Sequence, residues 1–239
     1  MKIAAIDSSG LVASVAILKD DIMLAQYSVN YKKTHSQTLL PMLSEITKMT
    51  EFDLESVDAI AVAKGPGSFT GLRIGSATAK GLGQALDKPI IEVPTLDAMA
   101  YQLYGANRMI CPLMDARRNQ VYTGVYAFED RGGGNIEFQT IRPQCAVSVE
   151  EIISYLNETG KPVIYLGDGV PVYRDILERE TTVDFLFAPP HCNRQNAAAL
   201  ATLAKVYYEK GLMVSAAEHR PDYLRLSQAE RERLERQNA

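Results

Sequence analysis

The sequence predicts an α/β protein of two lobes, because one order of elements, βββαβαβα, occurs twice along its 239 residues. In each half three consecutive strands come before the first helix, which a doubly wound sheet of alternating strands and helices does not do. In the first half the apolar residues change from the period of a strand to that of a helix after the third strand. We therefore predict a first lobe of residues 1–105, a second lobe of residues 106–226 and a charged tail helix of residues 227–239.

The first half opens with three short apolar segments, which predict an antiparallel meander because Gly10 and the Asp20-Asp21 pair separate them. The period then becomes that of an amphipathic helix, with apolar residues at i, i+3, i+4, i+7 and i+10: Leu39, Met42, Leu43, Ile46 and Met49. We predict strands over residues 2–8, 12–18, 22–29, 57–63 and 90–93, and helices over residues 36–49, 70–86 and 95–104.

The second half repeats that order. Gly132-Gly133-Gly134 marks a turn between its second and third strands, and Ser148 with Glu151 forms a capping box that starts a helix. The tail carries alternating Glu and Arg, which predicts a solvated helix, with partner binding as the alternative. We predict strands over residues 109–115, 120–128, 137–141, 163–166 and 183–187, and helices over residues 149–156, 170–178 and 196–209.

Composition and charge exclude several classes of protein. A net charge of −4 and a pI near 5.5 do not suit a protein that binds nucleic acid by itself, since phosphate contacts need a basic face. No stretch reaches 18 apolar residues and no signal-peptide pattern follows Met1, so we expect a cytoplasmic protein without a membrane span. Neither disulfides nor a metal site are expected from the spacing of the cysteines and histidines: Cys111, Cys145, Cys192, His35, His191 and His219.

The most informative segment is Gly65-Pro66-Gly67-Ser68-Phe69-Thr70-Gly71-Leu72-Arg73-Ile74-Gly75, between a predicted buried strand and a predicted helix. Backbone N–H groups at a helix start can hold an anion, and glycines allow it to approach closely. The segment fails two stricter tests, because Leu72 stands where a Walker loop has Lys and Thr70 stands where the dinucleotide fingerprint has Gly. As a phosphate loop it is a weak signal.

The order of the elements resembles the actin, hexokinase and heat-shock ATPase superfamily (the ASKHA fold), whose lobes each contain a ribonuclease H-like sheet. The resemblance places Asp7-Ser8-Ser9-Gly10 and Asp115-Ala116-Arg117 at two phosphate loops, and Gly167-Asp168-Gly169 at an adenosine-contacting turn. Ser9 stands where Gly is usual, so we expect no tightly bound cofactor. Weak ATP or ADP binding is the alternative, at these candidate residues: Asp7, Ser8, Ser9, Gly65, Gly67, Ser68 and Asp115.

The helix after this segment carries a ridge of small residues, which recur every four positions: Gly71, Gly75, Ala79 and Gly83. Each interior Gly costs about 1 kcal/mol relative to Ala, a cost that is tolerable where another backbone must come close. That backbone belongs either to the protein's own sheet or to a helix of another chain. The sequence leaves both interpretations open.

Several motifs together resemble the bacterial TsaB (YeaZ) family over roughly residues 1–226. The block from Gly65 to Gly75 is the most specific of them. The others are Ile6-Asp7-Ser8-Ser9, His35-Ser36-Gln37 before Leu39-Leu40-Pro41, Pro94-Thr95-Leu96-Asp97-Ala98-Met99-Ala100, Met114-Asp115-Ala116-Arg117-Arg118 and Pro221-Asp222-Tyr223-Leu224-Arg225.

The resemblance implies a cytoplasmic role in the synthesis of N6-threonylcarbamoyladenosine (t6A) in tRNA. A TsaB-type chain is a non-catalytic scaffold and activator that pairs with a related TsaD-type transferase, is helped by a TsaE-type ATPase, and meets tRNA only through the complex. The pairing uses two first-lobe helices, here residues 36–49 and 70–86, and a homodimer through the same helices is expected as well. The implied interface residues are Leu39, Met42, Leu43, Ile46, Gly71, Ile74, Gly75, Thr78, Ala79, Leu82 and Gly83.

The resemblance also implies that the chain is not an enzyme by itself. TsaD-like enzymes carry His-Met-Glu-Gly-His after the strand that follows the Gly-Pro-Gly helix, and this His pair binds the metal. The matching residues here are Thr95-Leu96-Asp97-Ala98-Met99, so both imidazoles are replaced and we expect no metal. Two enzymatic alternatives are an ATPase or kinase that holds magnesium between Asp7 and Asp115, and a metalloprotease-like enzyme.

Overall fold

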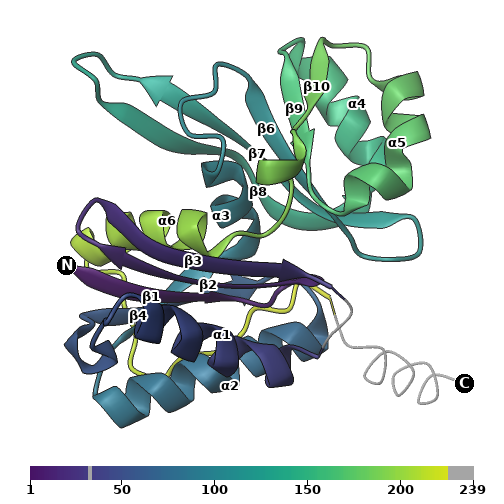
Figure 1. The fold of residues 1–239 in the computed structure, drawn as a ribbon. Coiled ribbons are helices and arrows are strands. Elements are labelled where there is room, and N and C mark those ends of the chain that lie inside the picture. The colour runs from purple at the N-terminus through teal and green to yellow at the C-terminus, as the bar shows by residue number, and fades with distance from the viewer. Residues whose placement is uncertain (32–33, 226–239) are drawn as a thin grey trace, which may run out of the picture.

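The computed structural model describes residues 1–31 and 34–225, and it contains two five-stranded mixed sheets of the same topology (Figure 1). In each sheet three strands form an antiparallel meander, and two later strands join it side by side, parallel to the first strand of the meander. The first sheet has the order β3(Ile22–Asn30), β2(Val12–Lys19), β1(Lys2–Asp7), β4(Ala59–Gly65), β5(Ile90–Pro94). The second has the order β10(Phe185–Phe187), β9(Val163–Leu166), β6(Met109–Asp115), β7(Gln120–Asp130), β8(Ile136–Ser148). The predicted duplicated, actin-like α/β fold is confirmed.

The helices cover both faces of the first sheet, as Figure 1 shows. α1(His35–Met49) and α2(Phe69–Leu86) pack on one face, and α6(Ala197–Glu209) packs on the opposite face. α4(Val149–Thr159) and α5(Gly169–Glu180) pack on the second sheet, while α3(Thr95–Tyr101) contacts both lobes. Within the described residues, no helix combines the length and the apolar character that a membrane span needs.

The apolar face of α1 is buried against the protein's own first sheet. Its four buried side chains are at most 5% exposed and pack against Ile6, Val15 and Ile17. Burying an aliphatic side chain of this size contributes roughly 1.5–3 kcal/mol. The four are predicted interface residues: Leu39, Met42, Leu43 and Ile46. Their atoms lie in the core, so the helical period here marks internal packing.

The ridge of small residues on α2 also faces the first sheet. A Cβ added to Gly71 would lie 2.1 Å from the carbonyl oxygen of Ser8, and one added to Gly75 would lie 2.5 Å from Ser8 Oγ. Ala79 is fully buried, and a Cβ on Gly83 would lie 3.0 Å from the carbonyl oxygen of Lys88. Of the two interpretations of this ridge, the structure shows packing within the chain.

The packing of α6 differs from the predicted division of the chain into lobes at residues 105 and 226. α6 follows the strands of the second sheet in sequence, but Leu200, Ala201 and Ala204 are buried against the first sheet. The segment after α6 also lies there, because Val214 forms a β-bridge with Ile90. Residues 197–214 therefore pack with the first lobe.

The ends of several elements also differ from the prediction. β8 was predicted over residues 137–141 and continues to Ser148, passing through Pro143. This is permitted because β8 is an edge strand, where a residue without an N–H group loses no ladder hydrogen bond. The predicted capping box is confirmed, since Ser148 accepts a hydrogen bond from the N–H group of Glu151. The tail helix predicted for residues 227–239 lies outside the described residues.

Candidate functional site

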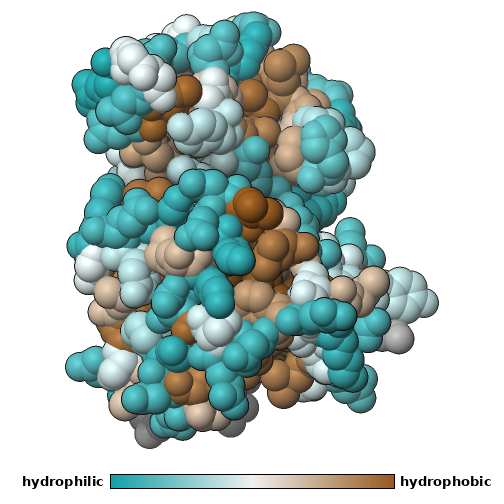
Figure 2. Space-filling model, turned by 60° about the vertical axis from the view of Figure 1, so that its left-hand side comes forward, coloured by the Kyte–Doolittle hydropathy of each residue, from teal (hydrophilic) through white to brown (hydrophobic). Residues whose placement is uncertain are grey.

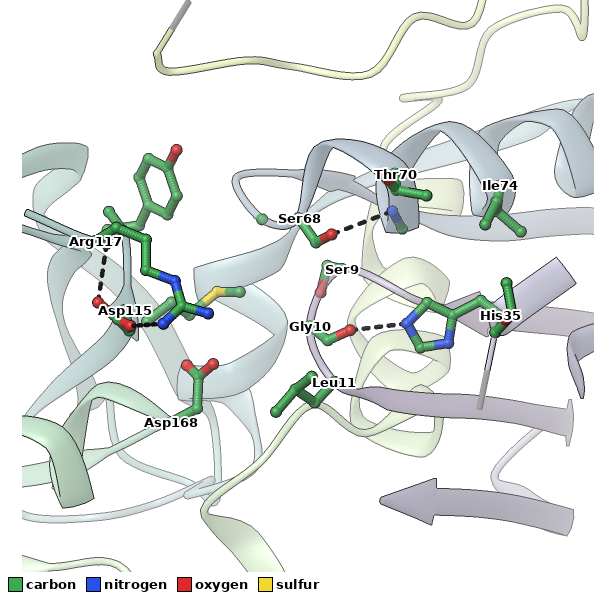
Figure 3. Close-up of a pocket in the computed structure, with 16 residues that line it drawn as sticks. Ser9, Gly10, Leu11, His35, Ser68, Thr70, Ile74, Asp115, Arg117 and Asp168 are labelled. Atoms are coloured by element: carbon green, nitrogen blue, oxygen red, sulfur yellow. Dashed lines mark hydrogen bonds and ion pairs between the residues drawn. The ribbon is translucent and has the colours of Figure 1, made fainter. Parts of the chain in front are cut away.

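A cleft of about 420 Å³ lies between the lobes (Figure 3). One wall comes from the β1–β2 turn at Ser9 and Gly10 and from the start of α2 at Ser68 and Thr70. The other wall comes from second-lobe residues that end β6 or precede α5: Asp115, Ala116, Arg117 and Asp168. Of the candidate nucleotide-binding residues, the structure brings four to this cleft, namely Ser9, Gly67, Ser68 and Asp115.

Asp7 and Ser8 lie behind the first wall of the cleft. Asp7 is fully buried, and its Oδ1 accepts hydrogen bonds from the N–H and Oγ–H groups of Ser9 at 2.9 and 2.6 Å. Burial raises the pKa of Asp7, while the hydrogen bonds from Ser9 act in the opposite direction. Ser8 Oγ donates to the carbonyl oxygen of Gly71 at 2.9 Å. These two residues therefore shape the turn that carries Ser9 to the cleft.

The glycines of the Gly65 to Gly75 block make room for neighbouring backbone. A Cβ on Gly65 would lie 2.2 Å from the carbonyl oxygen of Asp222, and one on Gly67 would lie 2.2 Å from that of Ser9. The N–H group of Ser68 donates to the same Ser9 oxygen at 2.7 Å, and Ser68 Oγ caps α2 by accepting from Gly71 N–H. Two N–H groups that a phosphate loop would offer are thus already hydrogen-bonded within the chain.

The second wall holds a carboxylate that is paired with its own neighbour. Asp115 Oδ1 accepts a hydrogen bond from the N–H group of Arg117 at 2.9 Å, and Asp115 Oδ2 lies 3.3 Å from Arg117 Nη1. Arg117, Arg118 and Asn119 all have a positive φ, between 57 and 64°. Non-glycine residues seldom adopt that conformation. This conformation turns the chain so that Arg117 faces Asp115. The Arg117 guanidinium therefore forms an ion pair with the carboxylate that would hold a metal ion in the ATPase alternative.

Asp168 faces the same cleft, as the turn Gly167-Asp168-Gly169 predicted (Figure 3). Burial raises the pKa of Asp168, and the charge of Arg194 acts in the opposite direction. Within the described part of the chain, Asp168 Oδ1 has no hydrogen-bond partner. Gly167 is required here because a Cβ would lie 2.1 Å from the carbonyl oxygen of Leu113 and its φ is +108°.

His35 also lines the cleft. His35 Nε2 lies 2.8 Å from the carbonyl oxygen of Gly10 and so helps to hold the turn of the first wall. Thr34, Met114 and Tyr122 line the cleft as well and were not predicted. Met114 directly precedes Asp115 in the sequence, whereas Thr34 and Tyr122 reach the cleft through the packing of distant elements, which no local pattern identifies.

The residues that match the metal-binding histidines of TsaD-like enzymes lie in the core between the lobes. Thr95 is fully buried and Met99 is 1% exposed, packed among apolar side chains of the second sheet. Asp97 between them accepts hydrogen bonds from Tyr126 at 2.8 Å and from Tyr207 at 3.2 Å. Across residues 1–31 and 34–225, no three His, Cys, Asp or Glu side chains gather into a metal-binding group.

The fold and the cleft together define a two-lobe actin-like α/β protein, in which the Asp115 carboxylate of the cleft is paired with Arg117 of the same chain. Comparison with known proteins narrows this class. The profile of the family described as "TsaD: tRNA N6-adenosine threonylcarbamoyltransferase" matches residues 23–233. The tRNA threonylcarbamoyladenosine biosynthesis protein TsaB of Bacillus subtilis is 33% identical over 243 residues, covering 99% of this chain and 100% of that protein. TsaB of Haemophilus influenzae is 33% identical over 236 residues, covering 94% of each chain.

A solved structure gives the same answer. YeaZ from Pseudomonas aeruginosa superposes with a TM-score of 0.76 at 27% sequence identity, covering 93% of this chain and 100% of that chain. The chain belongs to the TsaB (YeaZ) family, as the resemblance of its motifs indicated.

Proposed function

We propose that the protein is the non-catalytic subunit of t6A synthesis, which pairs with a TsaD-type transferase and activates it. The relatives' names place TsaB in t6A biosynthesis. The observation that carries the non-catalytic role is the environment of Thr95 and Met99, whose side chains fill the core where the enzyme's imidazoles would need an open metal site. Asp115 is paired with Arg117, which also disfavours the alternative of a magnesium-dependent ATPase.

The docking face that we propose consists of exposed positions of α1 and α2, rather than of the buried positions first implied. It includes Leu40, which is 53% exposed, and Arg73, Ala77 and Gly81, which follow one another at four-residue spacing along α2. Three of the implied interface residues, Ile74, Thr78 and Leu82, are half-buried beside them. Figure 2 shows a band of apolar residues among the polar ones on the first lobe. A homodimer would use the same docking face.

The Ala77→Arg variant tests this docking face. Ala77 is exposed, so the substitution should leave the monomer folded while it places a long charged side chain in the centre of the interface. We expect the affinity for the TsaD-type partner to fall about 100-fold, measured by isothermal titration calorimetry. Thr202→Arg, at an exposed position of α6 on the opposite face of the first sheet, is the matched control and should bind normally. Equal binding by both variants would place the interface elsewhere.

Reconstitution tests the non-catalytic role itself. Purified protein, supplied with tRNA and threonylcarbamoyl-AMP, is expected to form no t6A and to contain no stoichiometric metal. Addition of the TsaD-type partner, with a TsaE-type ATPase for repeated turnover, is expected to produce t6A, detected by mass spectrometry of the digested tRNA. Formation of t6A by the protein alone would refute the proposal. Weak ATP or ADP binding in the cleft and contact with tRNA only through the complex stay predictions, and titration with each ligand checks them.

A further inference from the structure

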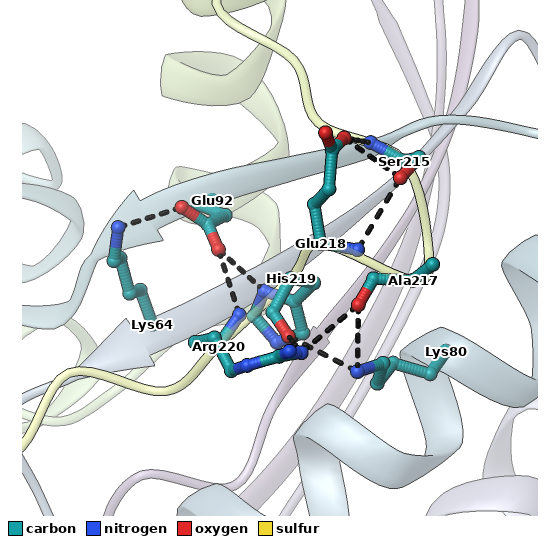
Figure 4. A network of polar contacts seen from close by, with 8 residues as sticks. All are labelled: Lys64, Lys80, Glu92, Ser215, Ala217, Glu218, His219 and Arg220. Carbon is teal, nitrogen blue, oxygen red and sulfur yellow. Dashed lines mark hydrogen bonds and ion pairs between the residues drawn. The ribbon is translucent and has the colours of Figure 1, made fainter.

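The segment that follows α6, residues 213–225, is fastened to the first lobe at several points (Figure 4). Val214 and Ile90 exchange backbone hydrogen bonds at 2.8 and 2.9 Å. His219 is 1% exposed, and its Nδ1 lies 2.7 Å from Glu92 Oε1. The second carboxylate oxygen of Glu92 lies 2.6 Å from Lys64 Nζ. The beginning of this segment is therefore anchored along the β5 edge of the first sheet.

The last residues of the segment reach across to the second lobe. The N–H group of Asp222 donates to the carbonyl oxygen of Lys64 in the first lobe at 2.7 Å. Asp222 Oδ2 also accepts from the side-chain amide of Gln144 on β8, at 3.4 Å. Arg225 Nη1 donates to the carbonyl oxygen of Ala116 at 2.5 Å. Ala116 belongs to the second wall of the cleft, so this segment ties that wall to the first lobe.

The same segment contacts the docking face. The ring of Tyr223 stacks on Phe69, the first residue of α2, with centroids 4.2 Å apart and an interplanar angle of 1°. Arg73 Nε donates to the hydroxyl of Tyr223 at 3.3 Å. Gly65 provides the space for this route, because a Cβ there would collide with Asp222. One short run, residues 222–225, thus touches the docking face, the first lobe and the cleft wall.

We propose that residues 213–225 form a latch that holds the cleft closed, and that a partner docking on α2 loosens it by engaging Arg73. The second half of this inference rests on the proposed function. An acidic side chain of the partner binds a guanidinium more strongly than a neutral phenol does, because its hydrogen bonds are charge-assisted and bidentate. Arg73 then leaves Tyr223, the stack on Phe69 loses its support, and Arg225 releases Ala116. Docking is in this way transmitted to the cleft.

Hydrogen exchange of the isolated protein tests the latch. In the turn between β6 and β7, the N–H group of Ala116 donates to the carbonyl oxygen of Gln120. The exchange rate of this N–H group therefore reports on the second wall of the cleft. The Arg225→Ala variant should exchange roughly three- to tenfold faster at residues 116–120, the effect of about one hydrogen bond. Arg220→Ala is the control, because among the described residues its guanidinium donates to carbonyl oxygens of the segment itself, those of Ala217 and His219. Unchanged exchange in Arg225→Ala, or an equal rise in Arg220→Ala, would overturn the latch.

The coupling is tested by adding a saturating amount of the purified TsaD-type partner. Exchange at residues 116–120 should rise in the wild-type chain. In Tyr223→Phe, which keeps the ring on Phe69 but removes the acceptor for Arg73, exchange should already be faster in the isolated chain and should not rise further when the partner is added. A bound partner that leaves wild-type exchange unchanged would overturn the coupling alone. If no partner binds, the proposed function and the coupling both fail, whereas the latch is still decided by the isolated chain.

Discussion

Replacing Gly71 with alanine is expected to lower the free energy of unfolding by about 1–3 kcal/mol, the usual cost of forcing an extra methyl group into a packed core. The added Cβ would lie 2.1 Å from the carbonyl oxygen of Ser8, a backbone atom held in the turn after β1. That turn cannot move without disturbing the hydrogen bonds of Ser9 to the buried Asp7. Urea unfolding, followed by circular dichroism, measures the change.

Gly81→Ala on the same helix is the matched control for Gly71→Ala. Gly81 is exposed, and a Cβ there would meet no described atom within 4 Å. Alanine therefore costs nothing in packing and should stabilise the protein by about 0.5–1 kcal/mol, because glycine is the poorer helix former. Equal effects of the two substitutions would show that the ridge does not lie against the sheet as described.

The second large effect is expected at Asp97, the carboxylate between the lobes. Asp97→Ala leaves the hydroxyl groups of Tyr126 and Tyr207 without their acceptor, at a cost of about 3 kcal/mol. Tyr126 belongs to the second sheet, whereas Tyr207 belongs to the helix on the first sheet. The substitution should therefore also weaken the joint between the lobes. Tyr207→Phe, which removes one of the two donors, should cost about 1 kcal/mol in the same urea titration.

The protonation of Asp97 gives that site a pH dependence. Burial raises the pKa of Asp97, and the hydrogen bonds from Tyr126 and Tyr207 act in the opposite direction. The folded state therefore keeps this proton to a higher pH than the unfolded chain does, so the stability from Asp97 is greatest at low pH and is lost as pH rises through the folded-state pKa. We expect the wild-type chain to gain stability relative to Asp97→Asn as pH falls from 7 toward the ordinary pKa of an aspartate, about 4. A constant difference between the two would contradict the raised pKa.

Local patterns in the sequence predicted most of the helices and strands. They could not predict which distant elements contact one another. The helical period of Leu39, Leu43 and Ile46 showed that this face of α1 is covered, but a period cannot say what covers it. The face packs on the protein's own sheet, so these implied interface residues are buried and the proposed docking face consists of exposed positions of the same helices.

The same limit applies to the cleft and to the joint between the lobes. The motifs at Asp7, Asp115 and Asp168 lie at strand ends or turns, which are predictable points, and all three line the cleft, the first of them through Ser9 and Gly10. The hydrogen bond between Asp97 and Tyr207 joins residues 110 positions apart, and no sequence pattern around either residue predicts that they meet. The passage of residues 213–225 beside Gly65 is likewise a contact between residues that are distant in the sequence. The motif that contains Gly65 was recognisable in the sequence, but the segment that packs against this glycine was not.

The place of α6 has a consequence for the order of events during synthesis. The inner face of the first sheet is covered by residues 197–209, which leave the ribosome after the whole second sheet has been made. Until then the apolar side of β1, β2 and β4 has no permanent cover, so the amino-terminal half cannot complete its core while it is being translated. The second sheet is in effect an insertion between the two parts of the first lobe, so we expect the first lobe to complete its core only after the second sheet has been synthesised.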